Sequence, residues 1–213
     1  MAGGLLDRLT DADRQALWAV MRRCRFGRGE VVFREGDLAD SLHVIVKGHI
    51  AARVTTPGGD TVILRVMGRD DLVGDYAVTS DAPRAATAVT LDVAETMVLH
   101  RDDFARLRRE QPQIDQFLLD AALHEVRRLS AALVDALHVP AERRVLRRLF
   151  EVAALWPPGE PLPLSQQDIA QLAGVTRQSA NRVLASAQAD GLVSIGRGRV
   201  EVIDPAGLER AAR

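Results

Sequence analysis

The residues best suited to chemistry in this sequence lie between positions 164 and 203. In the segment that starts at residue 177, small and apolar side chains recur with the spacing of one helix face. They are Ala180, Val183, Leu184 and Ala187. The opposite face carries Arg177, Gln178, Asn181 and Arg182. Because arginine can bind a guanine edge with two hydrogen bonds, and glutamine or asparagine can pair with adenine, this face is predicted to read bases in double-stranded DNA.

A second helix is predicted directly before this one. Ser165 to Asp168 matches the pattern S-x-x-D, which is typical of a capped helix start. Gly174 permits the positive φ of a tight turn between helices, and Thr176 can cap the helix that follows. The two helices and their turn therefore indicate a helix-turn-helix. Further DNA contacts are expected from residues near its helix starts, namely Ser165, Gln166, Thr176 and Ser179.

Two arginines lie at the tip of a predicted β-hairpin that follows the second helix. The run from Gly196 to Arg199 contains two glycines and separates two short apolar strands. Arg197 and Arg199 at this tip suit contacts to DNA phosphates. A solvated helix face would explain Arg177 and Arg182 taken alone. The capping pattern, the glycine turn, the outward arginines and the basic hairpin together favour DNA binding.

The composition limits the other classes of function. The chain has 213 residues and a formal net charge of −1, so a DNA contact must come from a local patch. One cysteine, Cys24, cannot form an iron–sulfur cluster or an intrachain disulfide. The five histidines show no metal-ligand spacing, which leaves a single haem-ligating histidine as the one open metal alternative. No P-loop, G-x-S-x-G or H-E-x-x-H motif indicates an enzyme.

No targeting or membrane segment is apparent. The first residues lack the charged and then apolar pattern of a signal peptide, and no apolar run approaches the roughly 18 residues of a membrane span. Together with the single cysteine, these observations predict a cytoplasmic protein without a membrane partner.

From Cys24 to about Leu99 the sequence is typical of a β-rich domain. Short runs of β-branched and apolar residues alternate with glycine turns, which favours a β-sandwich or barrel. Thr10 is predicted to cap a short helix before this domain. Asp102 and Asp103 are predicted to begin a helix after it.

A long helix is predicted from Pro112 to about Leu137. Its apolar residues alternate in steps of three and four, and they are Leu119, Ala122, Val126, Leu129, Leu133 and Ala136. Such a heptad seam favours a coiled-coil contact, so a homodimer through residues 112–137 is expected. The alternative is that the seam packs on the helix's own β-domain. Pro140 is then predicted to start another helix.

The predicted elements give an α+β chain in three parts. They are a β-roll domain over residues 1–110, a dimerisation helix and hinge over 111–138, and a winged helix-turn-helix domain over 139–213. Three sequence motifs lie within the predicted β-roll. They are Phe33-Arg-Glu-Gly-Asp37, Ile45-Val-Lys-Gly-His-Ile50, and Gly74-Asp75 with Pro83-Arg84-Ala85-Ala86. With these motifs and the segment 164–184, the chain resembles the cyclic AMP receptor protein / Fnr (Crp/Fnr) family of bacterial transcription regulators over nearly its whole length.

The resemblance implies a function and partners. Family members are homodimers that place paired recognition helices in successive major grooves of a near-palindromic site, and they contact RNA polymerase. By this resemblance Arg177, Gln178 and Arg182 read bases. The best-known family member has glutamate where Gln178 stands, so the operator is expected to differ at one position, since glutamate pairs with cytosine and glutamine with adenine. A nucleotide-independent regulator and a regulatory subunit that acts on a partner protein stay open as alternatives.

The resemblance also implies a jelly-roll-like cyclic-nucleotide-binding domain. Members that bind cyclic AMP use a Gly-Glu pair and an Arg-Ser or Arg-Thr pair, and the corresponding residues here are Gly74, Asp75, Arg84 and Ala85. Arg127 and Arg128 stand where the family contacts the purine. Losing the hydroxyl at Ala85 would cost about 1.5–3 kcal/mol, or roughly tenfold to a hundredfold in affinity. Three alternatives follow: cyclic AMP, another small anion, or no ligand, with Arg84 in an internal ion pair.

Overall fold

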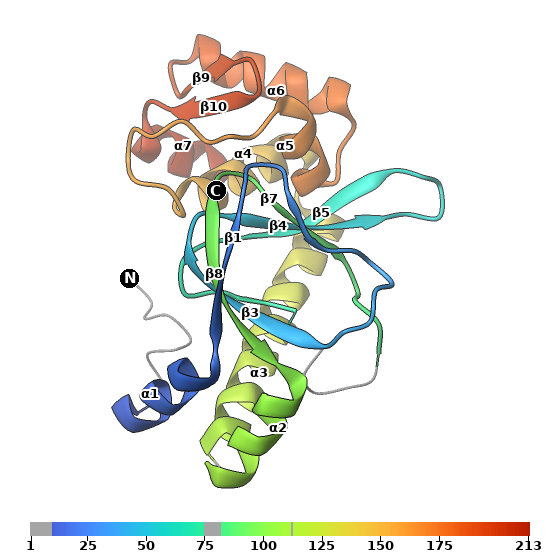
Figure 1. Cartoon of the computed structure of the whole chain (residues 1–213). Coiled ribbons are helices and arrows are strands. Elements are labelled where there is room, and N and C mark those ends of the chain that lie inside the picture. The colour runs from blue at the N-terminus through green and yellow to red at the C-terminus, as the bar shows by residue number, and fades with distance from the viewer. Residues whose placement is uncertain (1–9, 75–81, 112) are drawn as a thin grey trace. The chain divides into compact units, whose positions relative to one another are not determined.

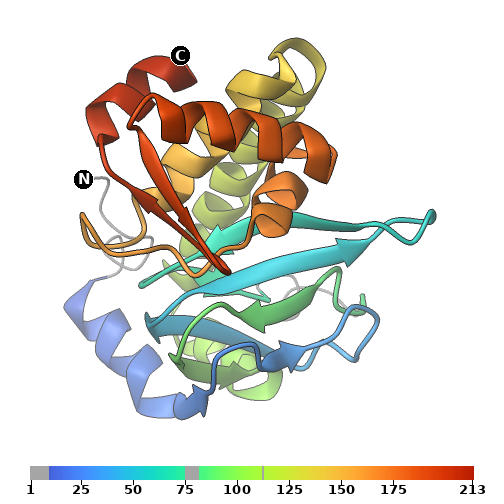
Figure 2. The ribbon, with the colours of Figure 1, turned by 90° about the horizontal axis from the view of Figure 1, so that it is seen from above.

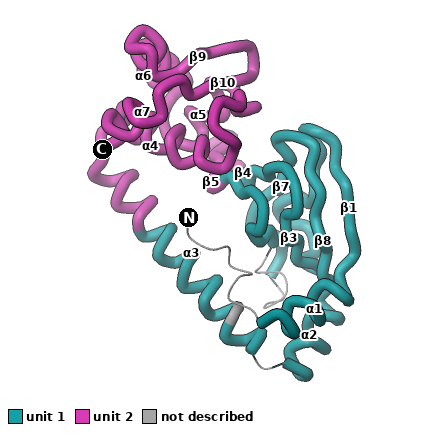
Figure 3. The backbone as a smooth tube through the Cα atoms, turned by 90° about the vertical axis from the view of Figure 1, so that its left-hand side faces the viewer, with its two compact units in different colours: residues 1–54, 66–130 teal, residues 55–65, 131–213 magenta. Residues whose placement is uncertain are grey.

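The computed structural model describes residues 10–74, 82–111 and 113–213 of the chain (Figure 1). It forms two compact units, coloured separately in Figure 3. The first unit comprises residues 1–54 and 66–130, and the second comprises residues 55–65 and 131–213. The α+β fold predicted from the sequence is confirmed, because a β-roll is followed by a long helix and a winged helix-turn-helix.

The β-roll contains two four-stranded sheets in the described residues, with strand orders β1-β8-β3-β6 and β2-β7-β4-β5. The strands are β1 Arg22–Phe26, β2 Val31–Phe33, β3 Ser41–Lys47, β4 Ile50–Thr55, β5 Thr61–Met67, β6 Leu72–Val73, β7 Thr87–Thr90 and β8 Ala94–His100. The chain changes sheet between β3 and β4 at Gly48, where φ is +80° and an added Cβ would lie 2.5 Å from the carbonyl oxygen of Val93. Only glycine fits this corner.

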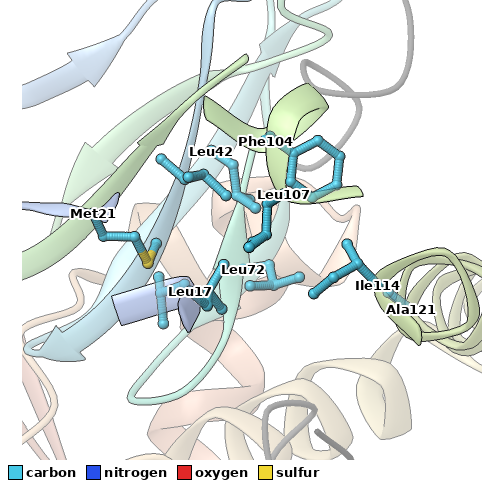
Figure 4. Close-up of a cluster of buried hydrophobic side chains, with 10 residues drawn as sticks. Leu17, Met21, Leu42, Leu72, Phe104, Leu107, Ile114 and Ala121 are labelled. Atoms are coloured by element: carbon cyan, nitrogen blue, oxygen red, sulfur yellow. The ribbon is translucent and has the colours of Figure 1, made fainter. Parts of the chain in front are cut away.

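Three helices cover the apolar core of the first unit. α1 (Asp11–Val20) begins at the predicted cap, where Thr10 Oγ1 accepts a hydrogen bond from the Asp13 N–H at 3.2 Å. α2 spans Arg101–Glu110 and α3 spans Gln113–His138. Figure 4 shows side chains from all three helices and the sheet meeting in one cluster, which consists of Leu17, Met21, Leu42, Val44, Leu72, Leu99, Phe104, Leu107, Ile114 and Ala121.

Only one face of α3 is covered by this core. Ile114 and Ala121 are buried, and Leu118 packs beside them. The predicted heptad seam lies elsewhere on the helix: Leu119, Val126, Leu129 and Leu133 are 45–60 % exposed, and Ala122 and Ala136 are exposed as well. The alternative in which the seam packs on its own β-domain is therefore wrong for Leu119, Ala122, Val126 and Leu129, which belong to the same unit as that domain.

The second unit is built on four helices and a hairpin. Its helices are α4 Ala141–Ala153, α5 Gln166–Ala173, α6 Arg177–Ala189 and α7 Pro205–Ala212, and its strands are β9 Val193–Gly196 and β10 Arg199–Val202. Figure 2 shows the two antiparallel strands of the hairpin as red arrows side by side. Helix α7 was not predicted from the sequence, although Asp204 caps it and Pro205 occupies its first turn.

The last turns of α3 are fastened within the second unit by a buried carboxylate. Asp135 is only 8 % exposed. Its oxygens accept hydrogen bonds from Arg147 Nη1 at 2.6 Å and from Arg148 Nη2 at 3.4 Å, and both arginines belong to α4. The two compact units consequently divide inside α3, between residues 130 and 131.

We expect Asp135→Ala to destabilise the second unit by about 1–3 kcal/mol, because two guanidinium groups lose a charged hydrogen-bond acceptor. Thermal unfolding followed by circular dichroism measures the change. The matched control is Asp190→Ala, at an exposed position after α6. Equal stability of the two variants would contradict a fastening role for Asp135.

Candidate nucleic-acid interface

The first helix of the helix-turn-helix starts at the predicted capping box. Ser165 Oγ accepts a hydrogen bond from the Asp168 N–H at 3.2 Å, and Asp168 Oδ2 accepts one from the Ser165 N–H at 2.8 Å. These reciprocal bonds satisfy two backbone donors that α5 would otherwise leave open.

The turn between α5 and α6 also follows the sequence prediction. Gly174 ends α5 in the left-handed region, with φ +61°. Thr176 Oγ1 then accepts a hydrogen bond from the Ser179 N–H at 3.1 Å and caps α6. The inner face of α6 is buried, and its residues are Ala180, Val183, Leu184 and Ala187. The inner face thereby fixes which side chains α6 presents to solvent.

The outer face of α6 carries three exposed side chains of the predicted set, Arg177, Gln178 and Arg182. Arg182 Nη2 lies 3.9 Å from Glu142 Oε1, but both groups are largely exposed, so water screens this pair. Asn181 differs from the prediction of an outward residue. It is half-buried, and its Oδ1 is buried with no hydrogen-bond partner among the described residues.

A pocket of about 270 Å³ brings three elements together. It is lined by the start of α5, the start of α6 and the tip of the β9–β10 hairpin, through Ser165, Gln166, Gln167, Arg177, Gly196, Arg197 and Gly198. Backbone N–H groups at a helix start and two guanidinium groups suit an anion such as a DNA phosphate. Gln167 was missed by the sequence analysis, although it adjoins Gln166 in the capped first turn.

Arg199 is exposed but does not line this pocket. An added Cβ at Gly196 would lie 2.8 Å from Arg199 Nε, so the side chain of Arg199 lies over the backbone of the hairpin. The structure thus groups Ser165, Gln166 and Arg177 with Arg197 and leaves Arg199 beside them.

In the first unit, the structure brings Arg84 and Gly74 together. The guanidinium of Arg84 is buried and lies 4.0 Å above the ring of Phe33. Arg84 Nη1 donates to the Ser41 carbonyl at 2.6 Å and to the Gly74 carbonyl at 3.4 Å, and Nη2 donates to Ser41 Oγ at 2.9 Å. An added Cβ at Gly74 would lie 2.3 Å from Arg84 Nη1, so this approach requires glycine.

The carboxylate beside Arg84 is Asp40, whose Oδ1 lies 3.5 Å from Arg84 Nη2. Asp75, which the sequence analysis considered as the ion-pair partner, lies outside the described residues. Burial lowers the pKa of Arg84, and the charges of Asp40 and Asp37 oppose that shift. Arg84 Nε is buried with no hydrogen-bond partner among the described residues, which leaves one N–H for an anion. Ala85 is exposed and offers no hydroxyl.

The two arginines predicted to face a purine have different surroundings. Arg127 is exposed. Arg128 is half-buried and donates to both carboxylate oxygens of Glu125, at 2.7 and 2.8 Å. Arg128 follows Ile114 and Ala121 at heptad spacing, on the face that α3 turns toward its own core.

His43 lies next to Arg84 in the same domain. Its ring contacts Phe26 and Phe33, with centroids 6.2 and 6.0 Å away, and Nδ1 is 3.1 Å from Thr96 Oγ1. Burial, and then the positive charge of Arg84, lower the pKa of His43 to about 4. Asp40 acts in the opposite direction, and His100 adds to the lowering.

The described residues contain neither a metal-binding cluster nor a helix that could span a membrane. No three histidine, cysteine or acidic side chains lie close enough together there to hold a metal ion. In the same part of the chain, every helix is too short or too polar to cross a membrane.

Comparisons with known proteins agree with this architecture. Residues 23–111 match the model of the cyclic nucleotide-binding domain, and residues 143–211 match that of the Crp-like helix-turn-helix domain. The chain is 28% identical over 204 residues to the CRP-like cAMP-activated global transcriptional regulator of Mycobacterium tuberculosis, covering 93% of this chain and 91% of the relative. It is 28% identical over 191 residues to the cyclic AMP receptor protein of Thermus thermophilus, covering 90% and 88%.

Solved structures give the same result. The catabolite activator protein of Thermus thermophilus is 27% identical, with a TM-score of 0.57, and the match covers 98% of this chain and 97% of that one. A second Thermus thermophilus structure, of a transcriptional regulator of the CRP family, is 25% identical, with a TM-score of 0.74, over 89% and 96% of the two chains.

The lowered pKa of His43 predicts acid sensitivity of the first unit. Above about pH 6.5, His43 is neutral in the folded and in the unfolded chain. Below that pH, the unfolded chain binds a proton on His43, whereas the folded chain binds it only near pH 4. Stability is therefore lost as the pH falls from about 6.5 to 4, by up to about 3 kcal/mol from this group. The free energy of unfolding, measured with urea at several pH values, should fall less steeply between pH 6.5 and 4 for His43→Phe than for the wild type. The same pH dependence in both proteins would contradict a lowered pKa of His43.

Proposed function

Because the chain belongs to the Crp/Fnr family of transcription regulators, we propose that it binds a near-palindromic operator as a homodimer, with one α6 in each of two successive major grooves. The observation that carries this proposal is the division of α6 into a buried apolar face and an exposed face with Arg177, Gln178 and Arg182. An arginine-bearing recognition helix held by a capped partner helix is the arrangement that major-groove reading requires.

The dimer contact is proposed for the exposed seam of α3, within residues 112–137. A stripe of leucine and valine at heptad spacing, exposed along a helix, is stabilised when a second copy covers it. Because the same seam occurs in both copies, the contact has two-fold symmetry. Two-fold symmetry of the protein then requires two-fold symmetry of the operator.

The residues of the interface have two roles in this proposal. Base reading belongs to Arg177, Gln178 and Arg182, whose donor groups match guanine and adenine edges. Phosphate contacts belong to the pocket and to the hairpin beside it, through Ser165, Gln166, Arg197 and Arg199. Thr176, Ser179 and Asn181 lie along the same helix start. Thr176 and Ser179 serve its cap, and Asn181 is half-buried.

We further propose that the β-roll binds a small anionic effector, with cyclic AMP as the first candidate. The Nε of Arg84, which has no hydrogen-bond partner among the described residues, and the close approach at Gly74 support an anion site. The bonds from Arg84 to Ser41, and the absence of a hydroxyl at Ala85, favour the second candidate, a regulator without a nucleotide. An effector would act by binding one conformation of the dimer more tightly than the other.

Two further parts of the proposal come from the family alone. Family membership supports a contact with RNA polymerase. A protein that binds chromosomal DNA would also work in the bacterial cytoplasm.

Selection of bound sites from a random DNA pool, at one salt concentration, with and without cyclic AMP, tests the proposed function. A near-palindromic site enriched only with the nucleotide is the result expected for a cyclic AMP-dependent dimer. The same site enriched in both conditions would favour the nucleotide-independent candidate. No enriched site in either condition would contradict sequence-specific DNA binding.

Arg182→Ala should cost about 1–3 kcal/mol of discrimination at one operator position, because it removes a donor to a base edge. Competition binding with operators substituted at each position measures this loss. Arg210→Ala, at an exposed position of α7, is the control for loss of one positive charge. Unchanged specificity at every position would remove Arg182 from the base-reading set.

Arg197→Ala should instead weaken binding to all DNA sequences alike. A contact to one phosphate contributes about one unit to the slope of log affinity against log salt concentration. Titrations of operator and non-operator DNA over a range of salt should therefore show a slope smaller by about one unit for both. A change confined to the operator would mean that Arg197 contacts a base.

A further inference from the structure

The C-terminal ends of two helices meet at one side chain of α4. Arg144 Nη1 donates to the Ala136 carbonyl at 3.3 Å and to the Val139 carbonyl at 3.1 Å, at the end of α3. Arg144 Nε donates to the Ala173 carbonyl at 3.1 Å, and Nη2 donates to the Gly174 carbonyl at 3.2 Å, at the end of α5. One guanidinium therefore bridges the long helix and the turn of the helix-turn-helix.

The chemistry of these helix ends explains why an arginine is needed there. The last carbonyl groups of a helix have no partner within it and carry the negative end of the helix dipole. A guanidinium offers five N–H groups in a rigid plane, so it can serve both ends at once. A lysine has the charge, but its single ammonium group cannot reach both sets of carbonyls in the same way.

The position of this bridge gives it a consequence for DNA binding. Ala173 is the last residue of α5, and Gly174 begins the turn that leads into α6. The last turns of α3 are also held on α4 through the ion pair of Asp135 with Arg147. Helix α4 therefore contacts the end of α3 through Arg147 and the end of α5 through Arg144. The direction of α6 is thus tied to the direction of the end of α3, all within the second unit.

We propose that Arg144 is a positioning residue for operator recognition, which converts the geometry of the paired α3 helices into the separation of the two recognition helices. This inference rests on the proposed function, since a separation exists only in a dimer on a two-fold site. Arg144 itself contacts no base in this account. Its loss should therefore relax the preferred spacing of half-sites and leave the preferred half-site sequence unchanged.

The experiment uses the full chain and the site selected from the random pool. Affinity is measured for that operator, for versions with one base pair inserted or removed at the centre, and for a single half-site. One base pair turns a half-site by about 35°, which a rigid dimer cannot follow. We expect the wild type to bind the operators with altered spacing at least about tenfold more weakly than the selected operator, because one half-site then loses its base contacts. We expect Arg144→Met to lose about threefold or less.

Arg143→Met is the matched control, because Arg143 is the exposed neighbour on the same helix. It should keep the wild-type spacing preference. Arg144→Lys retains the charge and is the second variant if Arg144→Met does not fold, as judged by thermal unfolding; it should relax the spacing preference as well.

Two results would overturn the inference. One is a wild-type spacing preference in the Arg144 variants. The other is an equal loss of affinity for the operator and the single half-site, which would assign Arg144 to the stability of the unit alone. If the wild-type chain itself selects no two-fold site, the proposed function fails first, and this inference falls with it.

Discussion

The structure depends on α3 having two apolar faces, of which the described residues of the chain cover only one. Ile114 and Ala121 pack into the core of the β-roll, whereas the seam through Val126 and Leu133 stays exposed. A helix cannot turn both faces toward one small domain, so the second face calls for another helix outside the chain. In the proposed dimer, a second copy supplies this helix with two-fold symmetry, and the two recognition helices are then related by the same axis.

Helix ends organise the second unit. Side chains cap the starts of three of its helices, through Ser165 on α5, Thr176 on α6 and Asp204 on α7, whereas α4 starts after Pro140 without a side-chain cap. Gly174 ends α5, and Arg144 donates hydrogen bonds to the last carbonyl groups of α3 and α5. These side chains pair with backbone N–H and C=O groups that the helix ends would otherwise leave without partners. The outward arginines are then available for DNA.

Features that are local in the sequence could be predicted. The capping box at Ser165, the turn at Gly174 and the seam of α3 depend on neighbours within a few residues, so the pattern alone identifies them. The partners of Arg84 could not, because Ser41 lies 43 positions away and only folding places it there. Asn181 was misjudged for a related reason: helix periodicity gives a direction but not the depth to which neighbouring elements bury a side chain.

Sedimentation equilibrium of the intact chain shows whether a second copy covers the exposed seam of α3. We expect a mass of about twice the 23.2 kDa of one chain. For a variant with Leu129→Glu and Leu133→Glu we expect a mass near 23.2 kDa, because the new charges would repel each other across the seam. A wild-type mass of one chain, at a concentration that saturates operator DNA, would contradict the account. So would a charged-seam variant that stays dimeric.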